Sequence, residues 1–177
     1  MSLDEDPVVN VIYTGIKKPI QLCMDNQCER AALQLMYAAI DSLARLGLPT
    51  SETECNRTHY GTWCTKYLKF NVSEEVKGLE WFAARCGFLH SYSATSNLSA
   101  ARKVRKIGYY SGEGLDVIYN PKESTDLVMV RVEGLLDAFF KGIDEFLIDL
   151  YTNLDKDLVE KRFSEMFHEL PWQEECL

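Results

Sequence analysis

The chain has 177 residues, of which 46% are hydrophobic and 26% charged, and its 19 Lys and Arg against 27 Asp and Glu leave a net charge of -8. This composition fits one domain over residues 1–177 and excludes a disordered chain and a collagen-like repeat. The sequence has no apolar run of 18 residues, and its acidic start does not resemble a secretory signal, so we expect a cytoplasmic protein with no membrane span. The acidic balance argues against a general duplex-DNA binder but allows a small local basic site.

The cysteines do not suggest a metal site. None of the six stands in a Cys-x-x-Cys pair, and together with the three histidines they offer no recognised zinc-ligand spacing. In a cytoplasmic chain we therefore expect reduced thiols, several of them buried as small hydrophobic side chains, and no metal or other cofactor.

Helical periodicity dominates the first half of the chain. Apolar residues recur every three or four positions over residues 27–46, and Gly47 and Pro49 follow as stop signals, which predicts an amphipathic helix. Residues 58–70 favour a shorter helix with its large aromatic side chains on one side.

A second strongly periodic segment follows. Ser73 is a suitable N-cap, and the apolar series that opens at Val76 predicts a helix over residues 74–92. The stretch 91–101 is rich in Ser, Thr and Asn, which indicates a loop or the frayed end of a helix.

The second half of the chain combines short strands with helices. Residues 106–110 and 115–119 are rich in Ile, Val and Tyr, and the turn-forming residues 111–114 between them predict a β-hairpin. The longest periodic segment predicts a helix over residues 126–153, and a final helix is expected over 155–169. The sequence therefore predicts an all-α fold, a four- to five-helix bundle with a small β-hairpin insertion.

Standard motifs for nucleotide binding, serine hydrolysis and zinc proteolysis are absent, so the helix predicted to end near residue 92 is the most informative segment. Arg85 and His90 lie about 140° apart on a regular helix and do not share one face. The flank of Arg85 also carries Trp81, Phe88 and Tyr92, and such residues are enriched at the centres of interfaces. We therefore expect Trp81 and Phe88 at a dimer interface, with packing inside the monomer as the alternative.

This segment resembles the Arg-x4-6-His motif of the HEPN superfamily, in the run Arg85-Cys86-Gly87-Phe88-Leu89-His90. The order of the predicted elements is loosely similar to that superfamily over most of the chain. The resemblance implies an all-α domain that forms a homodimer through the motif region. Many members are metal-independent endoribonucleases of toxin or defence systems, whereas others act as antitoxins, nucleotide binders or interaction modules. Active members often carry Asn, Asp or His directly after the arginine, where this chain has Cys86.

By that resemblance Arg85 and His90 are the catalytic pair. Cleavage of RNA by its own 2′-hydroxyl needs a proton acceptor, a proton donor and positive charge, which an imidazole and a guanidinium supply. Ser91 and Tyr92 adjoin the histidine and are candidates to position the phosphate or the attacking hydroxyl. A basic cluster further along the chain would attract the phosphate backbone of RNA through Arg102, Lys103, Arg105 and Lys106.

Two other functions fit the same residues. One is a non-catalytic module that binds a nucleotide or a partner protein through the same cleft, and the other is a purely structural dimer. In those cases His90 is a buried histidine bonded to a carbonyl, and Arg85 forms a salt bridge, for which Asp41 is a candidate partner. The basic cluster would then be an ordinary solvated face.

Overall fold

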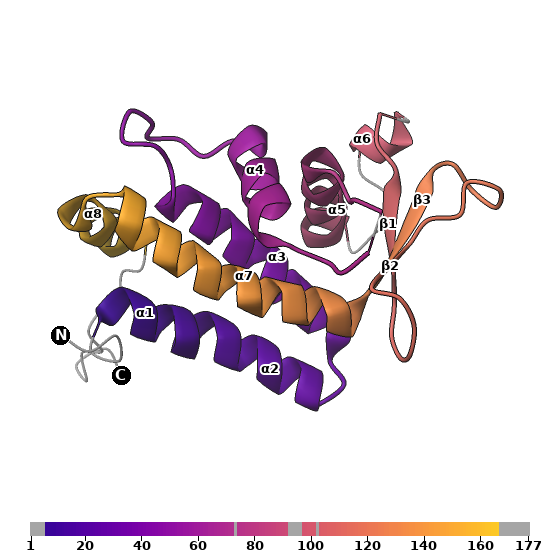
Figure 1. The fold of residues 1–177 in the computed structure, drawn as a ribbon, viewed down its shortest axis with the longest axis horizontal. Helices are drawn as coiled ribbons and strands as arrows, with labels where there is room; N and C mark the ends of the chain where they lie inside the picture. Colours follow the sequence, from indigo (N-terminus) through magenta and orange to yellow (C-terminus); the bar gives the residue numbers. More distant parts are fainter. Residues whose placement is uncertain (1–5, 73, 92–96, 102, 167–177) are drawn as a thin grey trace, which may run out of the picture.

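Helices make up most of the molecule, and a small sheet lies at one end (Figure 1). The computed structural model describes residues 6–72, 74–91, 97–101 and 103–166. The helical segments are, in chain order, α1 (Pro7–Val11), the π-helical η2 (Ile12–Lys17), α2 (Lys18–Asp25), α3 (Glu29–Leu46), α4 (Arg57–Tyr67), α5 (Gly78–Ser91), α6 (Asn97–Ala100), α7 (Val132–Asn153) and α8 (Lys156–Met166). The strands are β1 (Lys106–Tyr110), β2 (Val117–Ile118) and β3 (Leu127–Arg131).

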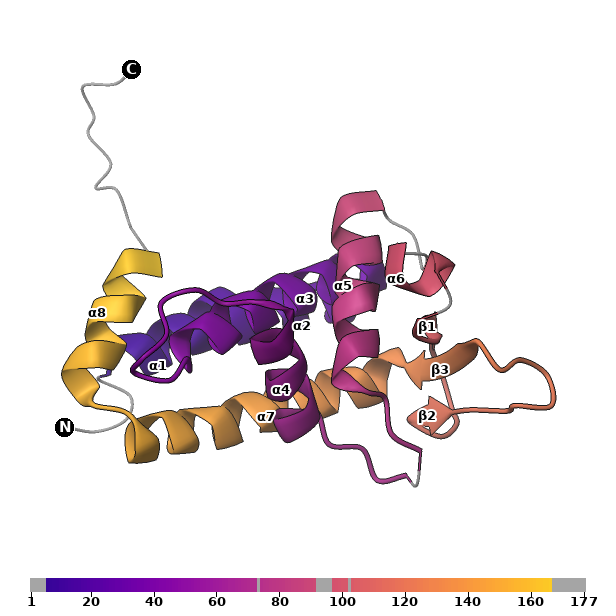
Figure 2. The ribbon, with the colours of Figure 1, turned by 90° about the horizontal axis from the view of Figure 1, so that it is seen from above.

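The prediction of a helical fold with a small β insertion is confirmed in outline, although the chain is not all-α. Helix α3 contacts α2, α4, α5, α7 and α8, so it lies at the centre of the helical part. Figure 2 shows α5 between α4 and the sheet, with α8 at the opposite end of the molecule. Within the described ranges, no helix is both long enough and apolar enough to cross a membrane.

The core between α4 and α7 is aromatic. Trp63 of α4 packs against Phe139 and Phe146 of α7, with 6.0 Å between ring centroids in both pairs. Gly142 allows this close approach, because a Cβ at that position would lie 2.6 Å from the carbonyl oxygen of Tyr67. Helices α4 and α7 are therefore closely packed, and their relative position is set by these contacts.

The first helical rod, α1 to α2, was not predicted from the sequence. Asp6 caps it, since its Oδ1 accepts hydrogen bonds from the backbone N–H of Val8 at 2.9 Å and of Val9 at 3.2 Å, and Pro7 occupies the first turn. The rod buries an apolar residue at every fourth position and lies along α7. These buried residues are Val8, Ile12, Ile16 and Ile20.

Helix α5 begins at Gly78, four residues later than predicted. The predicted cap, Ser73, lies outside the described residues, and Val76 is buried in the extended segment before the helix. The first turn is held instead by Glu80, whose Oε2 accepts a hydrogen bond from the backbone N–H of Lys77 at 2.8 Å. A glutamate three residues into a helix that bonds back to the N-cap backbone is one half of a capping box.

The predicted hairpin of residues 106–110 with 115–119 is wrong. Strand β3, at residues predicted to open the long helix, lies between the other two strands, pairs in parallel with β1 and pairs antiparallel with β2. Val128 and Val130 of β3 are fully buried on alternate positions, so this segment follows the period of a strand, and the helix starts only at Val132.

The remaining boundaries differ little from those predicted. The stretch expected as a loop over 91–101 contains the short helix α6, and α4 ends three residues before the predicted end at 70. Helix α8 follows the prediction as far as the structure describes it, to Met166.

Candidate functional site

Helix α5 places the residues that the sequence singled out. Arg85 lies in its second half, and His90 and Ser91 are its last two residues, with side chains outside the described part of the chain. Tyr92 and Arg102 also lie outside the described residues.

Trp81 and Phe88 are core residues of the protomer. Their exposed fractions are 1% and 8%, and Trp81 stacks on Phe70 while Phe88 packs edge-on against Tyr109 of β1. The expectation that they form a dimer interface is corrected by this burial, because neither side chain offers surface to a partner. Their apolar bulk fills the space between α5 and its neighbours in the same chain.

Arg85 forms the salt bridge with Asp41 that the sequence suggested. Its Nε and Nη2 both donate to Oδ2 of Asp41 in α3, at 2.8 and 2.6 Å, and both side chains are half-buried. Burial lowers the pKa of Arg85, but the hydrogen bond and negative charge of Asp41 outweigh it, so that the pKa is raised. Asp41 thus fixes the orientation of a guanidinium that stays charged.

This pair lines a cavity of about 330 Å³, which we call the arginine pocket. Its walls come from α3, from the segment before α4, from the start of α4 and from the middle of α5. Three guanidinium groups line it against one carboxylate. The lining residues are Asp41, Arg45, Cys55, Asn56, Arg57, Phe82 and Arg85.

The candidate site residues predicted from the sequence do not include Arg45 and Arg57, although each position carries a local signal. Arg45 follows Asp41 by one helical turn, which places both on one face of α3. Arg57 opens α4 next to a reciprocal cap, in which Asn56 Oδ1 accepts from the backbone N–H of Thr58 at 2.8 Å and His59 Nδ1 accepts from that of Asn56 at 3.2 Å. The cap fixes where α4 begins and so where Arg57 stands.

Cys55 is not suited to act as a nucleophile in this pocket. Burial raises the pKa of its thiol, and the charge of Asp41 raises it further, while Arg45 and Arg85 act in the opposite direction. Since the thiolate is the reactive form, the thiol is weakly reactive near neutral pH.

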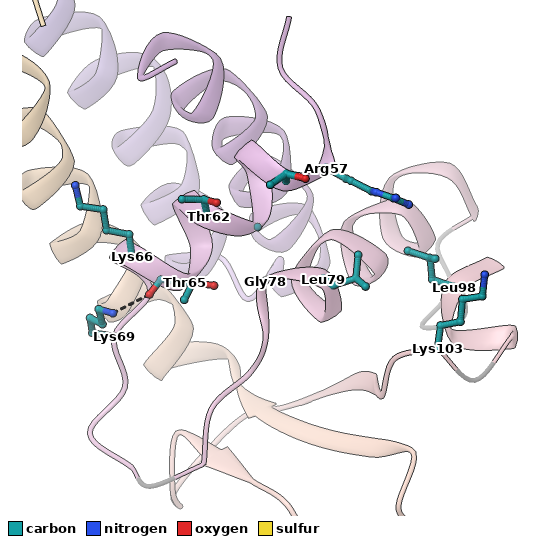
Figure 3. A pocket seen from close by; sticks show the side chains of 11 residues that line it. Arg57, Thr62, Thr65, Lys66, Lys69, Gly78, Leu79, Leu98 and Lys103 are labelled. Atoms are coloured by element: carbon teal, nitrogen blue, oxygen red, sulfur yellow. Dashed lines mark hydrogen bonds between the residues drawn. The ribbon is translucent and has the colours of Figure 1, made fainter. Parts of the chain in front are cut away.

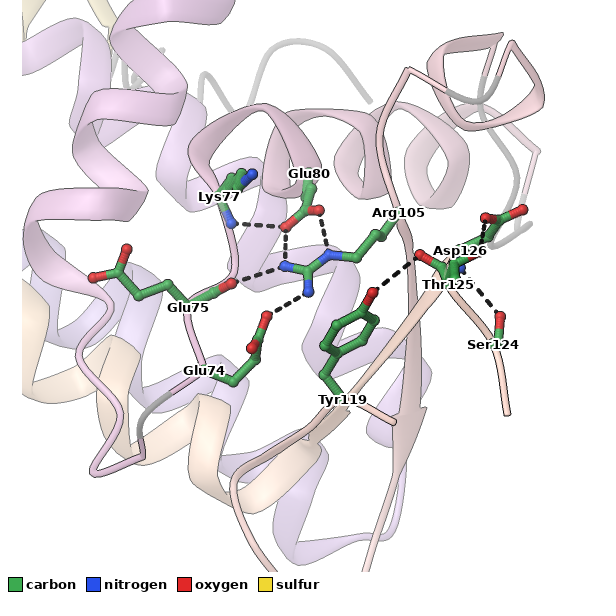
Figure 4. Close-up of polar contacts among 9 residues, drawn as sticks. All are labelled: Glu74, Glu75, Lys77, Glu80, Arg105, Tyr119, Ser124, Thr125 and Asp126. Atoms are coloured by element: carbon green, nitrogen blue, oxygen red, sulfur yellow. Dashed lines mark hydrogen bonds and ion pairs between the residues drawn. The ribbon is translucent and has the colours of Figure 1, made fainter. Parts of the chain in front are cut away.

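The described residues of the basic cluster, Lys103, Arg105 and Lys106, have different surroundings. Arg105 faces inward, where its Nε and Nη2 donate to the two carboxylate oxygens of Glu80 at 2.6 and 2.9 Å, and Nη1 donates to Glu74 (Figure 4). Nη2 also donates to the carbonyl of Glu75 at 2.8 Å, and the guanidinium lies 4.5 Å from the ring centroid of Tyr119.

Arg105 is therefore a structural residue, which corrects its assignment to phosphate binding. Hydrogen bonds to Glu80 raise its pKa, and Glu80 itself is only 3% exposed. Lys106, also expected at the binding site, is half-buried at the start of β1. Lys103 is exposed and lines a second cavity.

This second cavity, which we call the basic groove, has a volume of about 900 Å³ and runs along the outer face of α4 (Figure 3). Cations and threonine hydroxyls make up most of its polar lining, and no acidic residue is among the lining residues described. The lining residues are Arg57, Thr58, Gly61, Thr62, Thr65, Lys66, Lys69, Gly78, Leu79, Leu98 and Lys103.

Two glycines form the closest contact between the walls of the basic groove. A Cβ on Gly78 would lie 2.5 Å from the carbonyl oxygen of Gly61, so α4 and the start of α5 touch through their backbones. Of the cations, Lys66 is paired with Asp149 at 2.6 Å, and Lys69 donates to the carbonyl of Thr65 at 2.7 Å.

Compared with known proteins, the chain matches no family model, no curated protein and no solved structure. Within the described ranges, no group of three or more His, Cys, Asp and Glu side chains is placed to hold a metal ion.

Proposed function

We propose that the protein is a metal-independent endoribonuclease of HEPN type that binds RNA at the arginine pocket and cleaves it through Arg85 and His90 in a homodimer. The observation that carries the proposal is the pocket itself, in which Arg45, Arg57 and Arg85 converge from three helices around a single carboxylate. Guanidinium groups are the side chains best suited to phosphate oxygens, and three of them leave this cavity with an excess of positive charge.

The roles of the residues follow from their chemistry. Arg85, oriented by Asp41, stabilises the charge that develops on the phosphorane, and the exposed Arg45 and Arg57 hold the neighbouring phosphate oxygens. His90 follows Arg85 by five residues at the end of the same helix, and its imidazole transfers protons to and from the ribose and leaving oxygens. A second protomer would supply a second histidine, so that one acts as base and the other as acid.

The homodimer in this proposal uses surface other than Trp81 and Phe88, because both are buried within one protomer. Light scattering at micromolar protein concentration tests this part, and a strict monomer would contradict the shared site.

The cleavage assay uses RNA incubated with the protein in EDTA. We expect fragments that end in 2′,3′-cyclic phosphate, their loss in His90→Ala, and at least about tenfold slower cleavage in Arg45→Gln, since a phosphate contact is removed. Arg30→Gln is the matched control, because Arg30 is also an exposed arginine of α3 but lies outside the pocket lining. Intact RNA at high protein concentration would contradict the ribonuclease proposal.

A second candidate function is non-catalytic binding of a nucleotide in the same pocket. The observation that favours it is that Asp41 occupies both Nε and Nη2 of Arg85, while Cys86 follows the arginine. Binding of a nucleoside triphosphate that is lost in Arg45→Gln, together with intact RNA, would support this function over cleavage.

A further inference from the structure

We infer that the basic groove along α4 holds the backbone of single-stranded RNA on one side of the arginine pocket. The inference rests on the proposed function for the identity of the polymer, and it adds a binding surface that the motif residues do not supply. It assigns the phosphate contacts of this surface to Lys69 and Lys103, with Arg57 as the residue between the two cavities.

The two cavities are joined at Arg57. This side chain lines both, from the first turn of α4, and Figure 3 shows it extending toward the wall of the groove that Leu98 and Lys103 form. A chain of phosphates leaving the arginine pocket therefore meets a cation at the entrance of the groove before it reaches the next ones.

The surrounding charge favours one direction for such a chain. Two hollows next to the groove share Lys69 or Lys103 with it, but acidic residues in their walls balance the basic ones. A polyanion is therefore attracted more strongly along α4 toward Arg57, where the described lining contains cations and no acidic residue. The acidic residues of these two hollows are Glu74, Glu75, Glu80 and Asp126.

The length of the groove suits a short oligonucleotide. From Arg57 to Lys66, α4 spans about 14 Å at about 1.5 Å per residue, which corresponds to about four stacked nucleotides at about 3.4 Å each. The three threonines of this face add hydroxyl groups that donate to phosphate oxygens or bond to the ribose 2′-hydroxyl. They are Thr58, Thr62 and Thr65.

The lining also indicates what is recognised. No aromatic side chain stands among the described residues of the groove, so bases have no stacking platform there. The contacts available are those to phosphate and sugar, which fix the position of a strand without reading its sequence. We therefore expect binding that is independent of base sequence, dependent on length and strongly dependent on salt.

The experiment measures RNA binding by protein that carries His90→Ala, so that cleavage does not interfere. Fluorescein-labelled single-stranded RNAs of 3 and 12 nucleotides are titrated over a range of salt concentrations in EDTA. In Lys69→Gln/Lys103→Gln we expect about tenfold weaker binding of the 12-mer, unchanged binding of the 3-mer in the arginine pocket, and a salt slope smaller by about 1.4, at about 0.7 per lost phosphate contact.

The matched control is Lys141→Gln/Lys161→Gln, which makes the same change of net charge at exposed lysines outside the groove lining. Equal affinities of the two double variants for the 12-mer would overturn the inference. Thr62→Glu provides a second variant, since Thr62 is exposed and the new carboxylate places negative charge in the groove. Thermal melts verify that each variant is folded.

The outcomes separate this inference from the proposed function. If wild-type protein leaves RNA intact while the 12-mer still binds through the groove, the cleavage proposal is refuted and the inference of RNA binding in the groove is retained. If the protein cleaves RNA and the groove variants bind and cleave like the control, only the inference about the groove is refuted. A glutamate polymer of equal charge that binds as tightly as the 12-mer would overturn the assignment to RNA.

Discussion

Arg85 of α5 and Asp41 of α3 are joined by two hydrogen bonds to one oxygen, from Nε at 2.8 Å and from Nη2 at 2.6 Å to Oδ2. The pair connects two helices and at the same time forms part of the wall of the arginine pocket. Its structural and functional roles can be separated, because the two partners carry opposite charges.

Asp41→Asn is expected to destabilise the protein by about 1 kcal/mol, a modest value because the pair is only half-buried. The same change removes the carboxylate of the arginine pocket and should tighten the binding of RNA or of a nucleotide. Arg85→Ala should destabilise the protein similarly but weaken binding. Urea unfolding and a binding titration check both variants, and a purely structural pair would give two stability losses with no change in affinity.

Arg105→Ala is expected to cost about 3 to 5 kcal/mol, because Glu80 would be left buried without its positive partner. Arg131→Ala is the matched control, since Arg131 pairs with Asp116 where both side chains are about a quarter exposed, and there we expect a clearly smaller loss of stability. Urea unfolding measures both. Similar losses in the two variants would contradict the structural role of Arg105.

The sequence predicted the structure most accurately where the signal lay within one short segment of the chain. The apolar spacing of α3 and of most of α7 indicated their buried faces. For Asp41 the sequence left several partners open, and Arg85 was one of them. The rod α1 to α2 had a comparable local signal in Asp6, Pro7 and the four-residue apolar spacing that follows. These residues are sufficient to predict a helix there.

Other features depend on contacts between distant segments. Residues 127–131 fit a helix start and a strand equally well by composition, and only the pairing with β1 and β2 decides between them. In the same way, nothing near Arg105 in the sequence indicates that Glu80 and Tyr119 surround it. The arginine pocket and the basic groove arise from the packing of α3, α4 and α5, which no local pattern specifies.

Gly78→Ala should destabilise the protein by about 1 to 3 kcal/mol, because the added Cβ would collide with the backbone of Gly61 and separate α4 from α5. Gly15→Ala is the control with the opposite sign. Its Cβ would meet only Val11 Cγ1 at 3.7 Å, an ordinary contact, and replacing a helical glycine should stabilise by about 0.5 to 1 kcal/mol. Thermal melts compare the two, and a neutral Gly78→Ala would show that the two helices do not depend on this contact.

The acid dependence of stability should contain a contribution from Asp149. Hydrogen bonds from the Lys66 ammonium, at 2.6 Å, and from the Tyr67 hydroxyl, at 3.0 Å, hold the pKa of the Asp149 carboxyl below its usual value. A carboxyl with a lowered folded pKa stabilises the protein above its unfolded pKa of about 3.9, and the contribution is lost as the pH falls through the lower folded value. The stability difference between wild type and Asp149→Asn should therefore be constant from pH 7 to about 5 and shrink below about pH 4.

Urea unfolding at pH 7, 5 and 3 measures this difference. The control is Asp137→Asn, at an exposed position of α7, for which we expect a smaller difference. A difference that stays the same at pH 3 would mean that Asp149 acts through something other than its charge.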